Sequence, residues 1–222
     1  MTKLKTSIRK IVIFGPQGSG KGTQAEFLSK ELGIPWISTG NIYRQNIEEQ
    51  TELGKLASQY SFKGKLVPDK ITNQLVAKRL KEKDAQEGFV LDGYPRNEIQ
   101  AEALDKMAKI DAVFEIAISD KESIRRISGR RVCACGMTYH IDFNPPQQQG
   151  ICDQCGKKLF QRKDDQEEIT RQRLAIYHQN TEILLKRYWK QKILIRINGE
   201  QSIPAVKEEI FQKINKSDFI KE

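Results

Sequence analysis

The chain has 222 residues, of which 38% are hydrophobic and 30% are charged, and its net charge is +9. This composition is typical of a globular protein and excludes a disordered chain, while the length suits one domain with small insertions. The apolar runs fall far short of the ~20 residues that a membrane span requires. Residues 1–10 lack the apolar stretch of a secretory signal. We therefore expect a cytoplasmic protein that does not bind membranes.

The positive excess is confined to two short segments. Residues 1–10 contain four basic residues and residues 186–196 contain five, and neither segment contains an acidic residue. A basic chain can bind nucleic acid, a membrane surface or small anionic ligands. We find no basic groove interleaved with aromatic residues, and we interpret Tyr188 and Trp189 as core or rim residues. The excess is therefore assigned no role beyond solubility, and we expect no nucleic-acid partner.

Short apolar segments alternate with longer amphipathic ones, an order typical of a parallel sheet covered by helices. Strands are predicted at residues 8–14, 89–92, 111–118 and 193–197, and helices at residues 21–32, 166–189 and 204–214. Two stretches break the alternation: residues 38–67 look helical, and residues 131–161 are rich in loop-forming residues. The sequence thus predicts an α/β fold with two insertions.

The segment between the first predicted strand and helix has the pattern GxxxxGK and reads GPQGSGKGT over residues 15–23. Glycines let backbone N–H groups converge on phosphate oxygens, and the following helix directs its positive N-terminus at them. Lys21 supplies a charge to the β- and γ-phosphates, and a nearby hydroxyl can meet Mg²⁺. The pattern predicts a nucleotide-phosphate site, the alternative being an ordinary glycine-rich turn.

Further motifs follow in order along the chain. They are ISTG at residues 37–40 with Arg44, GKLV at 64–67, LDGYPR at 91–96 with Gln100, GRRV at 129–132, RKDD at 162–165 and ING at 197–199. Together with the GKGT ending of the phosphate loop, this series resembles the adenylate kinases, a family of nucleoside-monophosphate kinases, over nearly the whole chain.

The resemblance implies a P-loop NTPase fold with a parallel five-stranded sheet flanked by helices. It also implies a core of residues 1–37, 68–129 and 163–222, a helical monophosphate-binding insertion at 38–67, and a small lid at 130–162. The implied reaction is reversible, Mg²⁺-dependent phosphoryl transfer, ATP + AMP = 2 ADP, by a monomer. Such a transfer needs positive groups and exclusion of water but no protein base, because the attacking phosphate oxygen is already ionised.

The resemblance also implies roles for individual residues. The catalytic residues are Lys21, Arg96, Arg130, Arg162, Arg173, Asp164 and Asp165. The ATP site comprises Gly18, Ser19, Gly20, Lys21, Gly22, Thr23, Arg126, Arg130, Thr138, Tyr139 and Gln201. The AMP site comprises Thr39, Arg44, Lys65, Leu66, Val67, Gly93, Tyr94, Pro95, Arg96, Gln100, Arg162 and Arg173. Asp92 would hold Mg²⁺ through water.

Each of these residues also has a simpler interpretation. An isolated arginine is most often a solvated surface charge, and Asp92 can be a turn residue at the end of a strand. Asp164 and Asp165 suit a helix N-terminus, where acidic residues are favoured. The chain departs from most relatives at Asn41, where they have Asp, and at Tyr43, where they have Leu or Met. The first change removes a carboxylate near the phosphates, and the second is expected to reshape the AMP base pocket.

All four cysteines lie within the lid. Cys152 and Cys155 form a CxxC pair, whereas Cys133 and Cys135 form a CxC pair where zinc-bearing relatives have CxxC. Two pairs of thiolates suit a structural, tetrahedral Zn²⁺ with no open position for water. A site of three sulfurs with another ligand such as His140, or a lid without metal, is the alternative. His178 is interpreted as a surface or packing residue.

Three other functions stay open at this point. Within the same fold, the donor could be GTP or the acceptor another monophosphate, although Thr39 and Gln100 favour AMP. The phosphate loop and the paired cysteines would also suit a nucleic-acid-binding ATPase with a zinc ribbon. A catalytically inactive nucleotide-binding partner is the third, and it is disfavoured because Lys21, Asp92 and the expected arginines are all present.

Overall fold

The computed structural model describes residues 6–61 and 63–215. Its centre is a parallel sheet of five strands in the order β2-β3-β1-β4-β7, which confirms the predicted fold class. The strands are β1 Lys10–Phe14, β2 Trp36–Ser38, β3 Phe89–Asp92, β4 Ala112–Ala117 and β7 Leu194–Asn198. Four of the five lie within or beside the ranges predicted from apolar runs. The three-residue strand β2 was not among those ranges.

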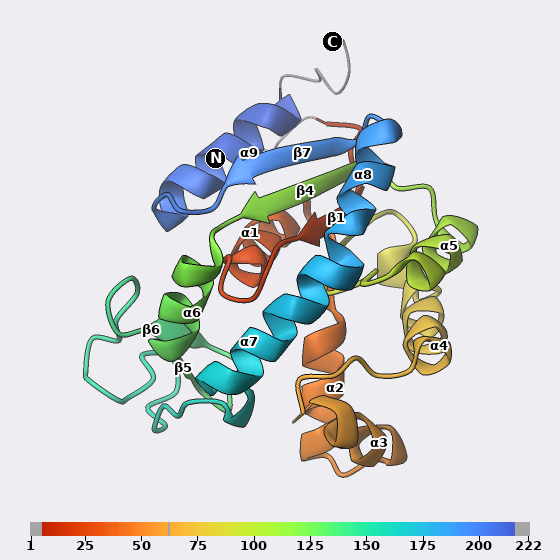
Figure 1. Cartoon of the computed structure of the whole chain (residues 1–222). Coiled ribbons are helices and arrows are strands. Elements are labelled where there is room, and N and C mark those ends of the chain that lie inside the picture. Colours follow the sequence, from red (N-terminus) through yellow and green to blue (C-terminus); the bar gives the residue numbers. More distant parts are fainter. Residues whose placement is uncertain (1–5, 62, 216–222) are drawn as a thin grey trace.

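Helices cover both faces of the sheet (Figure 1). Helices α1 Lys21–Leu32 and α9 Ile203–Asn215 pack on one face, where Ile11 and Ile13 of β1 contribute to a buried cluster. Helices α4 Asp69–Leu80, α5 Glu98–Met107 and α8 Ile183–Lys190 pack on the other, with Val12 and Phe14. Successive side chains of a strand point to opposite faces, so one apolar strand supplies two cores. A short 3₁₀ turn, Lys83–Ala85, follows α4.

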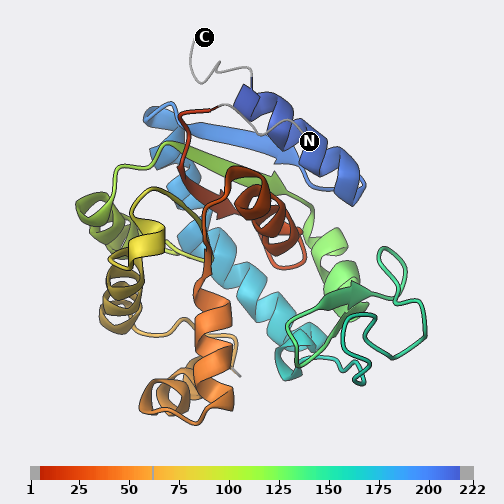
Figure 2. The same cartoon turned by 180° about the vertical axis from the view of Figure 1, so that it is seen from behind.

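Two excursions from the sheet lie at the same end of the molecule (Figures 1 and 2). One consists of α2 Thr39–Glu48 and α3 Glu52–Ser61 and fulfils the helical expectation for residues 38–67. The other leaves the sheet through α6 Asp120–Ser128 and forms the two-stranded sheet of β5 Arg130–Val132 and β6 Thr138–His140. Both views place the lower end of α7 Glu167–Ile176 between them.

The single helix predicted over residues 166–189 is corrected to three segments. A 3₁₀ turn at Lys163–Asp165 precedes α7, a π turn at Tyr177–Thr181 follows it, and α8 then continues the helical path. A π turn inserts an extra residue into a helix and rotates the residues after it. Here Thr181 within it donates a hydrogen bond of 2.9 Å to the carbonyl of Arg96. The interruption therefore joins this helix to the segment after β3.

Tyr188 is fully buried near the end of α8, whereas Trp189 is 71% exposed, so the pair divides between core and surface. None of the helices in the described part of the chain combines the length and apolar character needed to cross a membrane.

Candidate active site

The phosphate loop runs between the end of β1 and the start of α1, as the sequence predicts. Gly20 adopts a left-handed backbone (φ +89°) immediately before α1, a conformation that glycine adopts without strain. Gly18 (φ +74°) packs closely on α6, where a Cβ would lie 3.1 Å from the carbonyl of Ser123. The Ser123 hydroxyl in turn donates to the carbonyl of Gln17. Helix α6, which leads into the lid, thus holds the phosphate loop in place.

Lys21 begins α1 and lies among charges of both signs. Its ammonium group donates a hydrogen bond of 3.0 Å to the carbonyl of Pro16. The pKa of Lys21 is lowered to about 8, chiefly by burial and also by the nearby Arg96, Arg173 and Arg130, while Asp92 opposes these effects. A ligand with several negative charges would restore the full charge of Lys21, because it would offset the three guanidinium groups.

A buried carboxylate oxygen beside this loop suits a hard cation. Asp92 ends β3 opposite Ile13 of β1, and its carboxylate lies 3.9 Å from where a Cβ of Gly22 would be. Within the described residues, Oδ1 of Asp92 and Oγ of Ser19 are buried and have no hydrogen-bond partner. Mg²⁺ takes oxygen ligands and keeps several of its waters. The Asp92 carboxylate beside Gly22 therefore fits a magnesium ion carried in with nucleotide phosphates.

Arginines from four segments converge beside the loop. They are Arg44 of α2, Arg96 after β3, Arg130 of β5 together with Arg162 at the lid's two ends, and Arg173 of α7. Arg130 forms an ion pair with the fully buried carboxylate of Asp165. Arg173 donates a hydrogen bond of 2.8 Å to Asp164. The lid's two ends are thus joined to one another and to α7 by ion pairs.

These arginines repel one another across the site. Burial lowers the pKa of Arg162 to about 9, and the charges of Arg130 and Arg44 add to the effect. Burial likewise lowers the pKa of Arg173 to about 10, with Asp164 opposing it and Arg96 contributing. Guanidinium groups bind phosphate oxygens in pairs. The site is therefore poised to bind a ligand with several phosphates.

A second group of predicted residues meets between α2 and the segment after β3. The hydroxyl of Thr39 donates to the carbonyl of Gly93 at 2.9 Å, and Nε of Arg96 donates to the same carbonyl at 2.8 Å. Oε1 of Gln100 accepts from the backbone N–H of Arg96 at 2.8 Å, and its Nε2 donates to Asp69 at 2.7 Å. Four of the expected AMP-site residues are therefore in mutual contact.

Asp69 is a residue that the sequence reasoning missed. Its carboxylate accepts from both Gln100 and Asn97, so it orients the predicted base-reading amide. Its place in the first turn of α4 looked like an ordinary acidic helix start, and only the fold brings it beside α5. Glu122 was also missed, although it lies four residues before Arg126 in α6 and binds it at 2.6 Å, a helical spacing that the sequence does show.

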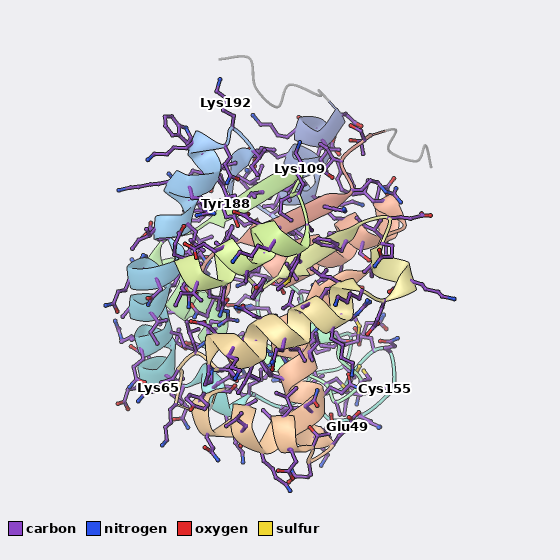
Figure 3. The ribbon with its side chains drawn as sticks, turned by 90° about the vertical axis from the view of Figure 1, so that its right-hand side faces the viewer. Glu49, Lys65, Lys109, Cys155, Tyr188 and Lys192 are labelled. Carbon is purple, nitrogen blue, oxygen red and sulfur yellow. The ribbon has the colours of Figure 1, made fainter. Side chains whose placement is uncertain are left out.

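Some predicted ATP-site residues lie apart from the arginines. The Tyr139 hydroxyl lies 3.5 Å from Sγ of Cys152, inside the lid's own core, and Thr138 is exposed. Gln201 donates to Glu209 and to the carbonyl of Asn198. Their expected roles at an ATP site stay predictions. Figure 3 shows Lys65 and Cys155 toward one end of the molecule and Lys109 and Lys192 toward the other.

The four cysteines come together in the lid. All four are free thiols, and their sulfur atoms lie within 4.8 Å of one another. Cys133 and Cys155 are 3.4 Å apart and Cys135 and Cys152 are 3.6 Å apart. Zn–S bonds of about 2.3 Å in a tetrahedron place sulfurs about 3.8 Å apart. The CxC and CxxC pairs therefore present sulfurs at spacings that fit a zinc ion.

The two cysteine turns resemble each other despite their different spacing. Each pair is followed by a glycine with a left-handed backbone, Gly136 (φ +97°) and Gly156 (φ +69°). A hydrogen bond from the Tyr139 hydroxyl lowers the pKa of Cys152 to about 6, which favours the thiolate form that binds metal. His140 is outside the cluster, because its Nδ1 accepts from the backbone of Asp142 at 3.0 Å and its Nε2 faces Gly129.

Comparison with known proteins gives consistent matches. The family model for adenylate kinase matches residues 13–193. A protein named adenylate kinase from Streptomyces avermitilis is 45% identical over 219 residues, which cover 96% of this chain and all of that protein. Adenylate kinases from Caldanaerobacter subterraneus subsp. tengcongensis and Methanosarcina barkeri are 48% and 49% identical, over 94% and 90% of this chain and 95% of each relative.

Proposed function

The chain belongs to the adenylate kinase family of phosphotransferases, and from that premise we propose which of its residues perform the transfer ATP + AMP ⇌ 2 ADP. The convergence of Lys21 with arginines from four segments beside the phosphate loop carries the proposal. Phosphoryl transfer depends on positioning and charge neutralisation, and this site offers both. When bound with ATP, Mg²⁺ neutralises phosphate charge near Asp92.

We assign the donor side to the phosphate loop and the lid. Backbone N–H groups of Gly18–Gly22 would bind the ATP phosphates, with Lys21 on the β- and γ-phosphates. Arg130, Arg162 and Arg173 would surround the transferring group, held in place by Asp164 and Asp165. Arg126, with Thr138, Tyr139 and Gln201, would complete the site for the ATP base.

The acceptor side is assigned to α2 and the segments that flank α4. Arg44 and Arg96 would hold the AMP phosphate, whose oxygen attacks the γ-phosphorus. Thr39 and Gln100 would bind the edge of the base, assisted by the backbone of residues 65–67. Residues 93–95 would close this side. The existing contacts of Gln100 with Arg96 and Asp69 support this assignment, since they fix its amide group.

The proposed division into units follows these roles. Residues 1–37, 68–129 and 163–222 form the core, residues 38–67 the monophosphate-binding insertion and residues 130–162 the lid. A structural Zn²⁺ held by the four cysteines would keep the lid folded.

Two substrates must enter and water must then leave, so we propose that lid opening limits turnover. A single-turnover transfer no faster than steady-state turnover would contradict this. We further propose a monomer that acts in the cytoplasm.

A coupled assay of ADP formation with each pair of nucleoside triphosphate and monophosphate tests the proposal. We expect the highest kcat/KM with ATP and AMP, and inhibition by an analogue that joins two adenosines through a polyphosphate. A higher kcat/KM with GTP, or with another monophosphate, would show that this nucleotide is the substrate in place of ATP or AMP. ATP hydrolysis that does not depend on AMP, accompanied by salt-sensitive nucleic-acid binding, would contradict the proposal altogether.

A further inference from the structure

Tyr43 is a buried tyrosine whose hydroxyl bonds to another buried side chain. It lies in α2 immediately before Arg44, and it is only 9% exposed. Its ring packs in a small cluster with Ala57 of α3 and with Val67. A leucine or methionine at this position would supply the same apolar contact, so the phenolic hydroxyl is the feature that requires an explanation.

That hydroxyl lies 2.8 Å from Oγ1 of Thr72 in α4. Thr72 is 5% exposed, so the hydrogen bond is buried. Oγ1 of Thr72 also lies 3.2 Å from the carbonyl of Pro68 and 3.4 Å from that of Val67. A threonine hydroxyl has one proton. Because this proton is directed at a carbonyl, Tyr43 donates to Thr72 and Thr72 donates to the backbone.

The resulting chain of hydrogen bonds joins two segments that approach the monophosphate from different sides. The chain of hydrogen bonds starts on α2, next to Arg44, and ends at the backbone carbonyls of Val67 and Pro68. Burial raises the pKa of Tyr43, and Arg96 and Asp69 lie near enough to act on it. The hydroxyl thus stays protonated, within electrostatic range of the two residues that contact Gln100.

We propose that Tyr43, acting through Thr72, is a positioning residue that fixes residues 65–67 against α2 and thereby sets the affinity and base preference of the monophosphate site. This inference rests on the assignment of that site to AMP. Tyr43 does not touch the reacting atoms. It holds the wall of the base pocket at a fixed distance from the arginine that binds the phosphate.

A double-mutant cycle tests the proposal with Tyr43→Phe, Thr72→Val and the double variant. Loss of one buried hydrogen bond should raise the KM for AMP by about fivefold in each single variant, with little change in kcat or in the KM for ATP. The double variant should show about the same increase as either single variant, because each single variant already breaks the same chain of hydrogen bonds. Preference for AMP over a pyrimidine monophosphate should fall in parallel.

Two controls separate positioning from stability. Thr72→Ser keeps the hydroxyl and should retain the wild-type KM for AMP. Tyr60→Phe removes a hydroxyl from the same cluster, where Tyr60 is only partly buried, and should leave both KM values unchanged. An unchanged KM for AMP in Tyr43→Phe, or effects that add fully in the double variant, would overturn the proposal even if the variants melt at lower temperature. Failure of the wild-type chain to use AMP would instead overturn the site assignment.

Discussion

The core and the lid of this molecule are held together by different interactions. In the core, two apolar clusters sandwich the sheet, and Ile11, Val12, Val90 and Phe114 are completely buried. In the lid, the buried cluster consists of Cys133, Tyr139 and Cys152, with Leu159 partly buried against it. Two of its three buried members are thus potential metal ligands. Burial of apolar area drives folding of the core, whereas the lid has little apolar area to bury.

In the lid, the residues that hold the structure together are therefore different from the residues assigned to catalysis. The lid's own interior contains the sulfur cluster, and the charged residues assigned to catalysis lie at its two ends or on the core. Arg130 and Arg162 bracket the lid, and Asp165, the ion-pair partner of Arg130, precedes α7. A lid held by the proposed zinc ion would therefore move as one unit while its boundary residues meet the phosphates. Four substitutions test this separation of roles.

The largest effect is expected from Lys21→Ala in the core. Removing the charge directed at the β- and γ-phosphates should lower kcat about a thousandfold. Because Lys21 makes its direct contact with a loop carbonyl, the fold and the zinc content of the lid should not change. Steady-state kinetics, metal analysis and thermal melting measure the three quantities. Lys30→Ala, on the exposed face of the same helix, is the matched control and should keep full activity.

Arg130→Ala tests the role of a charged residue at the boundary between the core and the lid. We expect kcat to fall about a hundredfold while the KM for ATP changes far less, because the guanidinium acts on charge that develops during transfer. Arg131→Ala is the control, since the neighbouring side chain contacts the carbonyls of Ser128 and Arg130 instead of the phosphate site. Equal losses in turnover and ATP binding would assign Arg130 to substrate binding alone.

Cys155→Ala tests what holds the lid. With three sulfurs the cluster should lose its zinc, and activity should fall about tenfold because the lid no longer closes as a unit. The main melting transition, which reports the core, should move by only a few degrees. Hydrogen exchange should show lost protection confined to residues 130–162. A loss of protection that extends through β1 and β4 would show that the two regions do not fold independently.

Much of the fold follows from the apolar pattern of the chain. Buried parallel strands give continuous apolar runs, so β1, β3 and β4 are readable from the sequence. The edge strand β7 contains the exposed Arg196, but Leu194, Ile195 and Ile197 around it still mark a strand. Strand β2 has three residues and follows Pro35, so its run is too short to distinguish from a loop. The π turn at Tyr177–Thr181 contains no glycine or proline that would mark a break in the helix, and its position becomes visible only through the contact of Thr181 with the segment after β3.

The candidate site also contains residues that the sequence identifies and contacts that only the fold shows. The phosphate loop and the paired cysteines are local patterns, so their residues could be named in advance. Partners that meet only in the fold could not. Asp69 and Gln100 are 31 residues apart, and Tyr43 and Thr72 are 29 apart. The resemblance named Tyr139 for an ATP site, but it could not show that its hydroxyl contacts Cys152.

The smallest expected effect concerns the two histidines, one in each region. His178 in the π turn contacts Glu182 at 2.8 Å and Asp120 of α6 at 2.9 Å. The hydrogen bond with Glu182, and then that with Asp120, raises its pKa above the ordinary value. The protonated form is therefore favoured by folding. This stabilisation is complete below the unfolded pKa of about 6.5 and disappears as the pH rises through the higher folded pKa.

His140 in the lid should behave in the opposite sense, because burial lowers its pKa. The contribution of neutral His140 to stability is lost as the pH falls from about 6.5 toward the lower folded pKa.

Replacing the half-exposed His178 by glutamine should lower the melting temperature by about 1–3 °C at pH 6 and by less at pH 8.5. Asp120→Asn should give a similar profile, and the double variant should add little to either. A melting difference for His178→Gln that is the same at both pH values would show that the residue acts by packing, and that no charged bridge joins α6 to the helix that leaves the lid.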